Sequence, residues 1–185
     1  MRIFISGGCK NGKSYMAQRL AKAQQKDKLY YVATMRSADP EDDGRIARHR
    51  LDRAGWGFET VEQPDNIGGM LEKCDSSGSF LLDSFTALLA NEMFRGSGVD
   101  GRAAEKINAD LAAILSAVGD IVFVSDYIYS DAIIYDPLTE LYRKSLAQID
   151  RFAAGRCEIV LESVYSNIIV HKGAEAFDAV SRKMP

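Results

Sequence analysis

Residues 4–14 read FISGGCKNGKS, a short apolar run that leads directly into a glycine-rich turn. The turn fits the pattern G-x-x-x-x-G-K-[ST], with Gly7, Gly12, Lys13 and Ser14 at its fixed positions. Glycines let the backbone approach an anion closely, and the N-terminus of a following helix presents its N–H groups to the same charge. The stretch therefore predicts a loop that holds nucleotide phosphates, with Lys13 on the terminal phosphates and Ser14 on a magnesium ion.

The flanking residues favour this interpretation over a glycine-rich turn that only caps a helix. Upstream, RIFIS is apolar and rich in β-branched residues, as a buried strand requires. Downstream, SYMAQRLAKAQQ is rich in helix formers and has apolar residues at helical spacing. A phosphate loop needs a strand before it and a helix after it, and the sequence predicts both.

Composition limits the class of protein. The chain has 185 residues, of which 46% are hydrophobic, and we expect a single nucleotide-binding domain over residues 1–185. Its net charge of -3 gives no basic footprint for nucleic acid. No apolar run approaches the ~20 residues of a membrane span, and no signal peptide is evident, so we expect a cytoplasmic protein. Its three cysteines, Cys9, Cys74 and Cys157, are far apart and suggest neither a disulfide framework nor a zinc site.

Apolar runs of strand length alternate with helical patterns along the chain, which predicts an α/β fold whose mostly parallel sheet is flanked by helices. The strand-like runs are 2–6, 28–34, 57–62, 79–84, 120–125, 157–162 and 166–171. The helical patterns lie near 14–25, 42–54, 85–95, 101–118 and 138–154. Only a few residues separate the last two runs, so we expect a terminal hairpin with an antiparallel edge strand. Ligands of such sheets bind beyond the carboxyl ends of the strands.

Asp83 ends the apolar run SFLLD. Enzymes with a phosphate loop place at such a strand end the carboxylate that helps to hold magnesium. A strand-terminal aspartate is also a common cap for the helix that follows, here FTALLANEMF. Beside a phosphate loop we favour the magnesium role.

Residues 39–56 read DPEDDGRIARHRLDRAGW. On a helix, Arg45, His49 and Arg53 share one face, so His49 looks outward between two guanidinium groups, while the other side gathers Ile46, Ala47, Leu51 and Ala54.

Positive neighbours keep an imidazole neutral, the state in which its nitrogen can attack phosphorus. The same arginines would stabilise the substrate phosphates and the leaving pyrophosphate. The spacing fits a solvated basic helix face equally well. The other histidine, His171, lies in an apolar terminal run, and we interpret it as structural.

Together these segments resemble the bifunctional adenosylcobinamide kinase and adenosylcobinamide-phosphate guanylyltransferase family of cobalamin biosynthesis. The matching segments are GGCKNGKS, YVAT, DPEDDGRIARHRLDRAGWGFETVEQP and LLDSFTALLANEMF. Asp83, Thr86 and Asn91 stand where the family expects them. Order and spacing agree across the first half of the chain.

The resemblance implies a P-loop NTPase-like fold, usually a homotrimer, that uses Mg²⁺, ATP and GTP and acts on a corrinoid. It implies phosphorylation of the aminopropanol hydroxyl of adenosylcobinamide, then transfer of GMP from GTP through a guanylylated histidine, which gives adenosyl-GDP-cobinamide. His49 would be that nucleophile and Lys13 a second catalytic residue, with Ser14 and Asp83 on the metal. The implied nucleotide contacts are Gly7, Gly8, Cys9, Lys10, Asn11, Gly12, Lys13, Ser14, Ala33, Thr34, Met35, His49, Arg50, Leu51, Asp52, Glu62 and Asp83.

The second half of the chain departs from the family pattern. Where the family has Asn-Glu-Val-Gly, this sequence has Asp126, Tyr127, Ile128 and Tyr129, and Asp150 with Arg151 replaces a later Asn-Gln. We expect the altered loop to limit use of the acceptor more than use of the nucleotide. Two alternatives therefore stay open: a P-loop kinase or nucleotidyltransferase that acts on a different acceptor, and a nucleotide-binding regulatory protein that has lost turnover.

Overall fold

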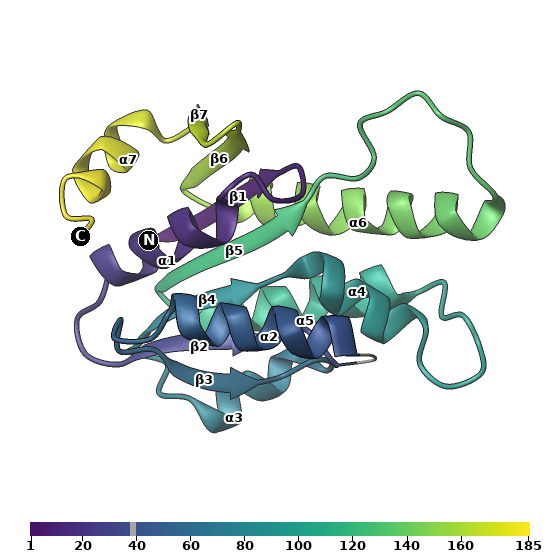
Figure 1. Cartoon of the computed structure of the whole chain (residues 1–185), viewed down its shortest axis with the longest axis horizontal. Coiled ribbons are helices and arrows are strands. Elements are labelled where there is room, and N and C mark those ends of the chain that lie inside the picture. Colours follow the sequence, from purple (N-terminus) through teal and green to yellow (C-terminus); the bar gives the residue numbers. More distant parts are fainter. Residues whose placement is uncertain (38–39) are drawn as a thin grey trace.

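The computed structural model describes residues 1–37 and 40–185 (Figure 1). Within the helix α2 (Pro40–Asp52) it describes the backbone throughout, but not the side chains of Glu41, Asp42, Arg45, His49 and Asp52. None of the described helices is long and apolar enough to cross a membrane.

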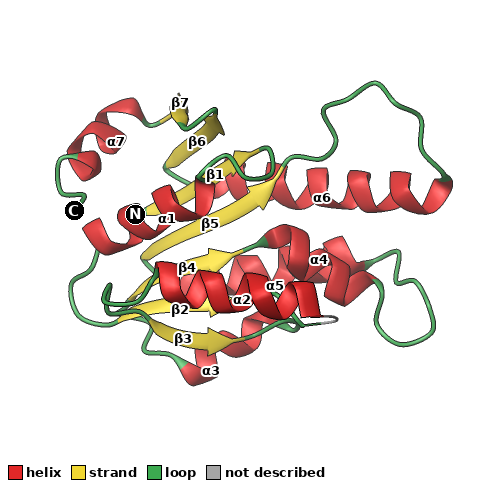
Figure 2. Ribbon diagram, in the orientation of Figure 1, coloured by secondary structure: helices red, strands yellow, loops and turns green. Residues whose placement is uncertain are grey.

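A single sheet runs through the described part of the chain, with seven strands in the order β3-β2-β4-β5-β1-β6-β7 (Figure 2). Neighbouring strands are parallel except β6 and β7, which pair antiparallel. The predicted parallel sheet and its antiparallel C-terminal edge are thus confirmed. The strands are β1 (Arg2–Gly7), β2 (Leu29–Ala33), β3 (Glu59–Glu62), β4 (Ser79–Asp83), β5 (Asp120–Asp126), β6 (Ile159–Val164) and β7 (Asn167–Lys172).

Helices cover both faces of this sheet. The helices besides α2 are α1 (Lys13–Ala23), the 3-10 helix η1 (Ile67–Gly69), α3 (Met70–Lys73), α4 (Phe85–Met93), α5 (Ala103–Ala117), α6 (Pro137–Arg156) and α7 (Ala174–Ser181). Strand side chains point alternately to the two faces, so in β4 Phe80 and Leu82 pack with α4, α5 and α6 while Leu81 packs with α1. This two-sided burial explains why the central strands β2, β4 and β5 are mostly apolar.

The element boundaries follow the sequence patterns closely, with three differences. The helix predicted near 42–54 runs instead from Pro40 to Asp52. The η1–α3 segment was not predicted, because one helical turn that contains two glycines carries too short a pattern. Helix α7 was also not predicted, since it has only eight residues.

The carboxyl ends of the parallel strands gather the loops in which a ligand site is expected. β1 leads into the glycine-rich loop, β2 and β3 lead into the segments that flank α2 and η1, and β4 meets α4 after a single residue. After β5, residues 127–136 arc away from the sheet before α6 begins (Figure 1). The predicted site residues of the first half therefore converge on one edge of the sheet.

Candidate nucleotide site

The glycine-rich loop has the strand, turn and helix that its sequence predicts. β1 ends at Gly7, and Gly12 adopts a left-handed conformation (φ 79°) immediately before α1 begins at Lys13. A Cβ atom on Gly7 would lie 2.5 Å from the Ser163 carbonyl oxygen, so only glycine fits there. Ser163 Oγ donates to the Asn11 carbonyl oxygen at 2.6 Å, and Asn11 Nδ2 donates to the Ser163 carbonyl oxygen at 3.3 Å. The end of β6 thus holds the loop in place.

Lys13 is buried at this loop, with 7% of its side chain exposed. Its Nζ donates to the Gly8 carbonyl oxygen at 2.8 Å and lies 2.6 Å from Asp126 Oδ1. Asp126 is the last residue of β5 and pairs in register with Gly7. Asp126 was not among the predicted nucleotide contacts. Its position at the end of the apolar run DIVFVSD was the available signal, the same signal that singled out Asp83.

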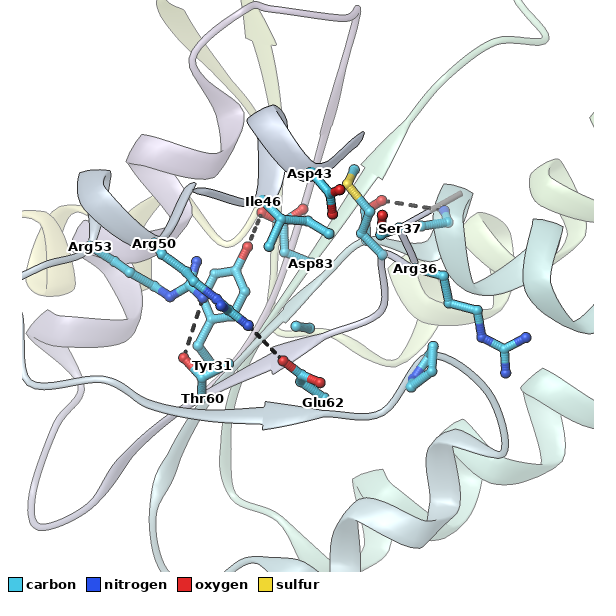
Figure 3. A pocket seen from close by; sticks show the side chains of 15 residues that line it. Tyr31, Arg36, Ser37, Asp43, Ile46, Arg50, Arg53, Thr60, Glu62 and Asp83 are labelled. Carbon is cyan, nitrogen blue, oxygen red and sulfur yellow. Dashed lines mark hydrogen bonds and ion pairs between the residues drawn. The ribbon is translucent and has the colours of Figure 1, made fainter. Parts of the chain in front are cut away.

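A cavity of about 460 Å³ opens at the ends of β2, β3 and β4, beside α2 (Figure 3). Its lining includes six of the residues predicted to contact nucleotide or phosphate: Ala33, Met35, Arg50, Arg53, Glu62 and Asp83. Asp43 and Ile46 contribute from α2, and Tyr31 and Thr60 from the strands. Tyr31 and Asp83 are 52 positions apart in the sequence, and the fold brings them together.

Three arginines and three carboxylates line this cavity and set its charge (Figure 3). Arg50 Nη2 lies 2.7 Å from Glu62 Oε1 in an exposed ion pair. The Arg53 guanidinium stacks 4.0 Å from the centre of the Tyr31 ring, and Tyr31 donates through its hydroxyl to Asp83 Oδ2 at 3.0 Å. Burial raises the pKa of Tyr31 far above its ordinary value, so the hydroxyl keeps its proton and remains a donor. The cavity offers both cationic and anionic groups to a ligand.

The predicted arrangement of arginines on α2 is wrong for Arg53. The helix ends at Asp52, so Arg53 lies in the turn that follows instead of on an outward helix face. Arg53 is only 7% exposed, because its guanidinium packs on the Tyr31 ring and donates to Thr60 Oγ1 at 3.3 Å. The opposite side of the helix does not form a buried apolar face either, since Leu51 is 75% exposed. The helical spacing of the charged residues predicted an outward Arg53, but the contact of its guanidinium with the Tyr31 ring determines where the side chain lies.

The capping alternative for Asp83 is also wrong. Ser84 is the N-cap of α4, and its hydroxyl accepts from the Ala87 backbone N–H at 3.5 Å. The Asp83 side chain lines the cavity instead. Thr34 holds the turn between β4 and α4, since its hydroxyl accepts from the Ser84 N–H at 2.7 Å and donates to the Ser84 carbonyl oxygen at 2.8 Å.

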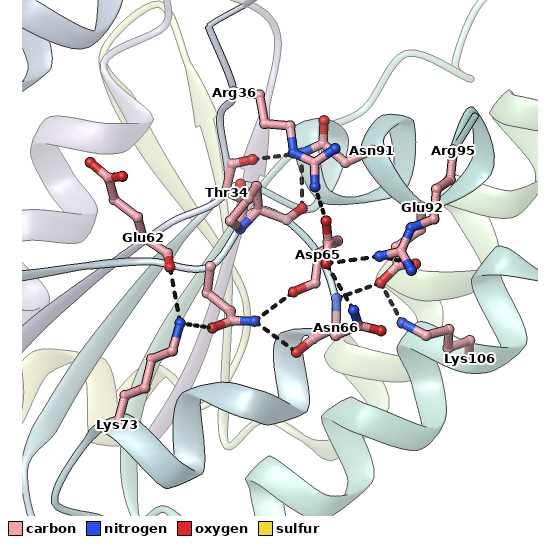
Figure 4. A network of polar contacts seen from close by, with 12 residues as sticks. Thr34, Arg36, Glu62, Asp65, Asn66, Lys73, Asn91, Glu92, Arg95 and Lys106 are labelled. Atoms are coloured by element: carbon pink, nitrogen blue, oxygen red, sulfur yellow. Dashed lines mark hydrogen bonds and ion pairs between the residues drawn. The ribbon is translucent and has the colours of Figure 1, made fainter. Parts of the chain in front are cut away.

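A polar network holds the far rim of the cavity (Figure 4). Asn91 Nδ2 donates to the carbonyl oxygens of Thr34, at 2.7 Å, and Pro64, at 2.8 Å, and so joins the loops after β2 and β3. Asp65 forms ion pairs with Arg36 and Arg95. Asn91 was expected from the resemblance alone, and the structure gives it a structural role.

The side chains of Arg45, His49 and Asp52 lie outside the described residues, so their predicted roles stay predictions. The backbone places His49 in the last turn of α2, immediately before the cavity residue Arg50. The other predicted contact on this helix, Leu51, is not part of the cavity lining.

The glycine-rich loop, residues 7–14, does not line the cavity either, and β4 and β5 separate its strand from β2. His171 is half exposed on β7, and its Nε2 lies 2.7 Å from Glu162 Oε2, which fits the predicted structural role.

The two predicted magnesium ligands, Ser14 and Asp83, both carry side-chain oxygens, which are the donors that Mg²⁺ prefers. The described residues contain no group of three or more His, Cys, Asp or Glu side chains that could hold a metal. Mg²⁺ in nucleotide sites needs no such group, because it takes one or two protein oxygens together with phosphates and water. Ser14, in the first turn of α1, and Asp83, at the end of β4, offer oxygens of the required type.

Two departures from the family pattern are partners in the structure. The Tyr129 hydroxyl donates to Asp150 Oδ2 at 2.7 Å. Asp150 is 3% exposed, and burial raises the pKa of its carboxyl group to about 7. The larger side chain at position 129 and the acid at position 150 therefore form one partly buried contact between the 127–136 loop and α6.

A phosphate loop between the first strand and helix of this mostly parallel sheet defines a P-loop NTPase-like protein. Solved structures agree on the fold. A KaiC-like protein from Pyrococcus horikoshii OT3 matches with a TM-score of 0.55 and 14% identity, over 92% of this chain and 79% of that chain. The ATPase domain of G40P matches with a TM-score of 0.52 and 12% identity, over 92% and 76%.

The sequence defines the family more narrowly. The family model for cobinamide kinase / cobinamide phosphate guanyltransferase matches residues 3–167, and the chain belongs to this family. The bifunctional adenosylcobalamin biosynthesis protein CobP from Pseudomonas aeruginosa is 30% identical over 170 residues, which cover 89% of this chain and 93% of that protein. The resemblance inferred from the motifs is thereby confirmed, and it extends into the divergent second half.

Proposed function

We propose that this protein phosphorylates adenosylcobinamide and then transfers GMP from GTP, through a guanylylated His49, to give adenosyl-GDP-cobinamide. Membership of the kinase and guanyltransferase family supports the pair of reactions. The observation that carries the proposal is that a phosphate loop and a 460 Å³ cavity both lie at the carboxyl ends of the parallel strands, the loop after β1 and the cavity beside β2, β3 and β4. This end of the sheet thus offers a place for phosphates and a separate place for a nucleoside or acceptor.

Lys13 and the N-terminus of α1 bind the triphosphate, because their positive charge faces the loop. Arg50 and Arg53 stabilise the negative charge that develops when pyrophosphate leaves, and the neutral ring of His49 attacks the α-phosphorus. A bound magnesium ion, held by Ser14 and Asp83, would neutralise phosphate charge.

Intact-mass measurement after incubation with GTP and Mg²⁺ tests the nucleophile. We expect one GMP per chain, in a bond that is labile in acid and stable in alkali, as a phosphoramidate is. His49→Ala should give no adduct, while His171→Ala, which removes the other histidine, should label normally. An adduct on the His49→Ala protein would place the nucleophile elsewhere, and no adduct on wild type would reject the guanylyl-enzyme step.

From the family resemblance we also propose a homotrimer of single-domain chains that works in the cytoplasm, where nucleoside triphosphates are available. Light scattering coupled to size exclusion tests the trimer directly. A monomer at all concentrations would reject it without affecting the proposed chemistry.

A further inference from the structure

Tyr31 contacts two residues that act in the proposed function, although it has no part in that function itself. Its hydroxyl donates to Asp83 Oδ2 at 3.0 Å, and the Arg53 guanidinium lies 4.0 Å from the centre of its ring. Asp83 is the carboxylate proposed for magnesium, and Arg53 is one of the cations proposed for the phosphates. One side chain thus joins a carboxylate and a cation that come from different segments (Figure 3).

The sheet register brings Tyr31 to this place. Tyr31 on β2 pairs with Leu81 on β4, and Asp83 is two residues further along β4. Residues two apart in a strand share a face, and a long aromatic side chain reaches its diagonal neighbour on the adjacent strand. Phe58 packs edge-on against the Tyr31 ring, with the ring centres 6.0 Å apart, and Tyr31 is 4% exposed. A ring enclosed in this way keeps its hydroxyl directed at Asp83.

Each contact has a physical effect on its partner. A hydrogen bond to an ionised carboxylate is strong and fixes the plane of the group. Residues that hold metal-binding carboxylates in this way account for about 10- to 100-fold in metal affinity or activity. Arg53 is a buried cation, and the face of the Tyr31 ring offsets part of the cost of removing it from water. Burial also lowers the pKa of the Arg53 guanidinium from its ordinary value.

We propose that Tyr31 is a positioning residue for the magnesium-bound triphosphate: its hydroxyl orients the Asp83 carboxylate toward the metal, and its ring holds Arg53 toward the phosphates. This inference rests on the proposed function for the metal and for the transfer of GMP. Tyr31 itself donates no proton to the substrate and forms no bond with it. Because the hydroxyl and the ring make different contacts, substitutions can remove the two effects one at a time.

The test compares Tyr31→Phe, which removes only the hydroxyl, with Tyr31→Leu, which removes the hydroxyl and the ring. Tyr30→Phe is the matched control. Tyr30 is the neighbouring residue on the same strand and is 1% exposed, but it packs on the opposite face of the sheet. Its hydroxyl accepts from the Asp75 N–H at 3.1 Å, so the control also loses one hydrogen bond of a buried tyrosine.

Calorimetric titration with the α,β-methylene analogue of GTP, which cannot transfer GMP, measures binding with Mg²⁺ and with EDTA. For Tyr31→Phe we expect affinity to fall by about tenfold or more with Mg²⁺, yet to stay within about twofold of wild type in EDTA. Tyr31→Leu should also lose about threefold or more in EDTA, because Arg53 binds phosphate without the metal. Tyr30→Phe should change neither affinity by more than about twofold. The rate of guanylylation by Tyr31→Phe should fall and recover in part as Mg²⁺ is raised.

Wild-type affinity of Tyr31→Phe with Mg²⁺, or an equal loss with Mg²⁺ and with EDTA, would overturn the role of the hydroxyl. Wild-type affinity of Tyr31→Leu in EDTA would overturn the role of the ring. If Tyr31→Leu does not fold, Arg53→Lys, which keeps the charge but loses the planar stack, takes its place and should show the same loss in EDTA. If wild type forms no GMP adduct, the proposed function fails, while the titrations still decide how Tyr31 acts on the bound triphosphate.

Discussion

At the scale of single residues, two buried cations, Lys13 and Arg53, dominate the electrostatics of the candidate site. Lys13 and Arg53 are both almost fully buried, and each has a fixed partner: a carboxylate for the lysine and an aromatic ring for the arginine. Burial disfavours the charged form of a group unless such partners compensate. Replacing either residue therefore affects binding more than a surface substitution would.

Lys13→Ala should weaken triphosphate binding by about 100-fold or more, because the backbone of the loop cannot replace a cation on the terminal phosphates. Isothermal titration with a non-hydrolysable analogue measures this. Lys26→Ala, which removes an exposed lysine paired with Asp120, should bind normally. Wild-type affinity in the Lys13→Ala protein would contradict the phosphate-loop assignment.

Asp150 predicts a pH dependence of stability. Burial raises its pKa in the folded protein to about 7 from an ordinary value of 3.8. The folded state therefore holds a proton that the unfolded state releases, so stability falls as the pH rises from about 4 to about 7 and is level above that. The loss is at most about 4 kcal/mol.

Asp150→Asn should remove this slope, since an amide keeps the bond from Tyr129 without a charge. Urea unfolding at pH 5 and pH 8 is the measurement. The variant should be more stable than wild type at both pH values, and by a clearly larger margin at pH 8 than at pH 5. Equal stability differences at both pH values would show that the carboxyl group titrates normally.

At the scale of elements, the sequence predicts strands better than it predicts the surroundings of α2. Strands β4 and β5 each contain an apolar run and end in an aspartate, so the sequence predicts both their extent and the end at which a side chain is available to a ligand. Arg53 could not be placed, because its stacking on Tyr31 depends on a contact between distant segments. The Tyr129–Asp150 contact is long-range in the same way, and so neither residue alone revealed it.

Helix α4 controls the shape of the cavity through Asn91, which binds the loops after β2 and β3. Asn91→Asp keeps the shape of the side chain but removes both donors, and it should cost about 1–3 kcal/mol of stability. We also expect the KM for GTP in guanylylation to rise. Asn167→Ala, which removes one exposed hydrogen bond, serves as the control. An unchanged KM for GTP in Asn91→Asp would show that the loops held by Asn91 do not contribute to nucleotide binding.

At the scale of the whole molecule, the phosphate loop and the cavity are carried by different strands of one rigid sheet. We therefore expect the two half-reactions to be separable by mutation. His49→Ala should lose guanylylation yet keep at least about half of the wild-type cobinamide phosphorylation, because β4 and β5 separate β2, which leads into α2, from the strand that carries the loop. Parallel loss of both activities, measured on the same preparation, would contradict this division.

The first strand of the sequence, β1, pairs with β5 and β6, two of the last, so Gly7 lies between Asp126 and Ser163. Synthesis proceeds at roughly 5–20 residues per second, so a nascent phosphate loop waits on the order of ten seconds for the strands that shape it. We therefore expect only chains extended beyond β6 to bind a triphosphate. On the proposed function, nucleotide in the cell would stabilise the finished fold and give no protection to the growing chain.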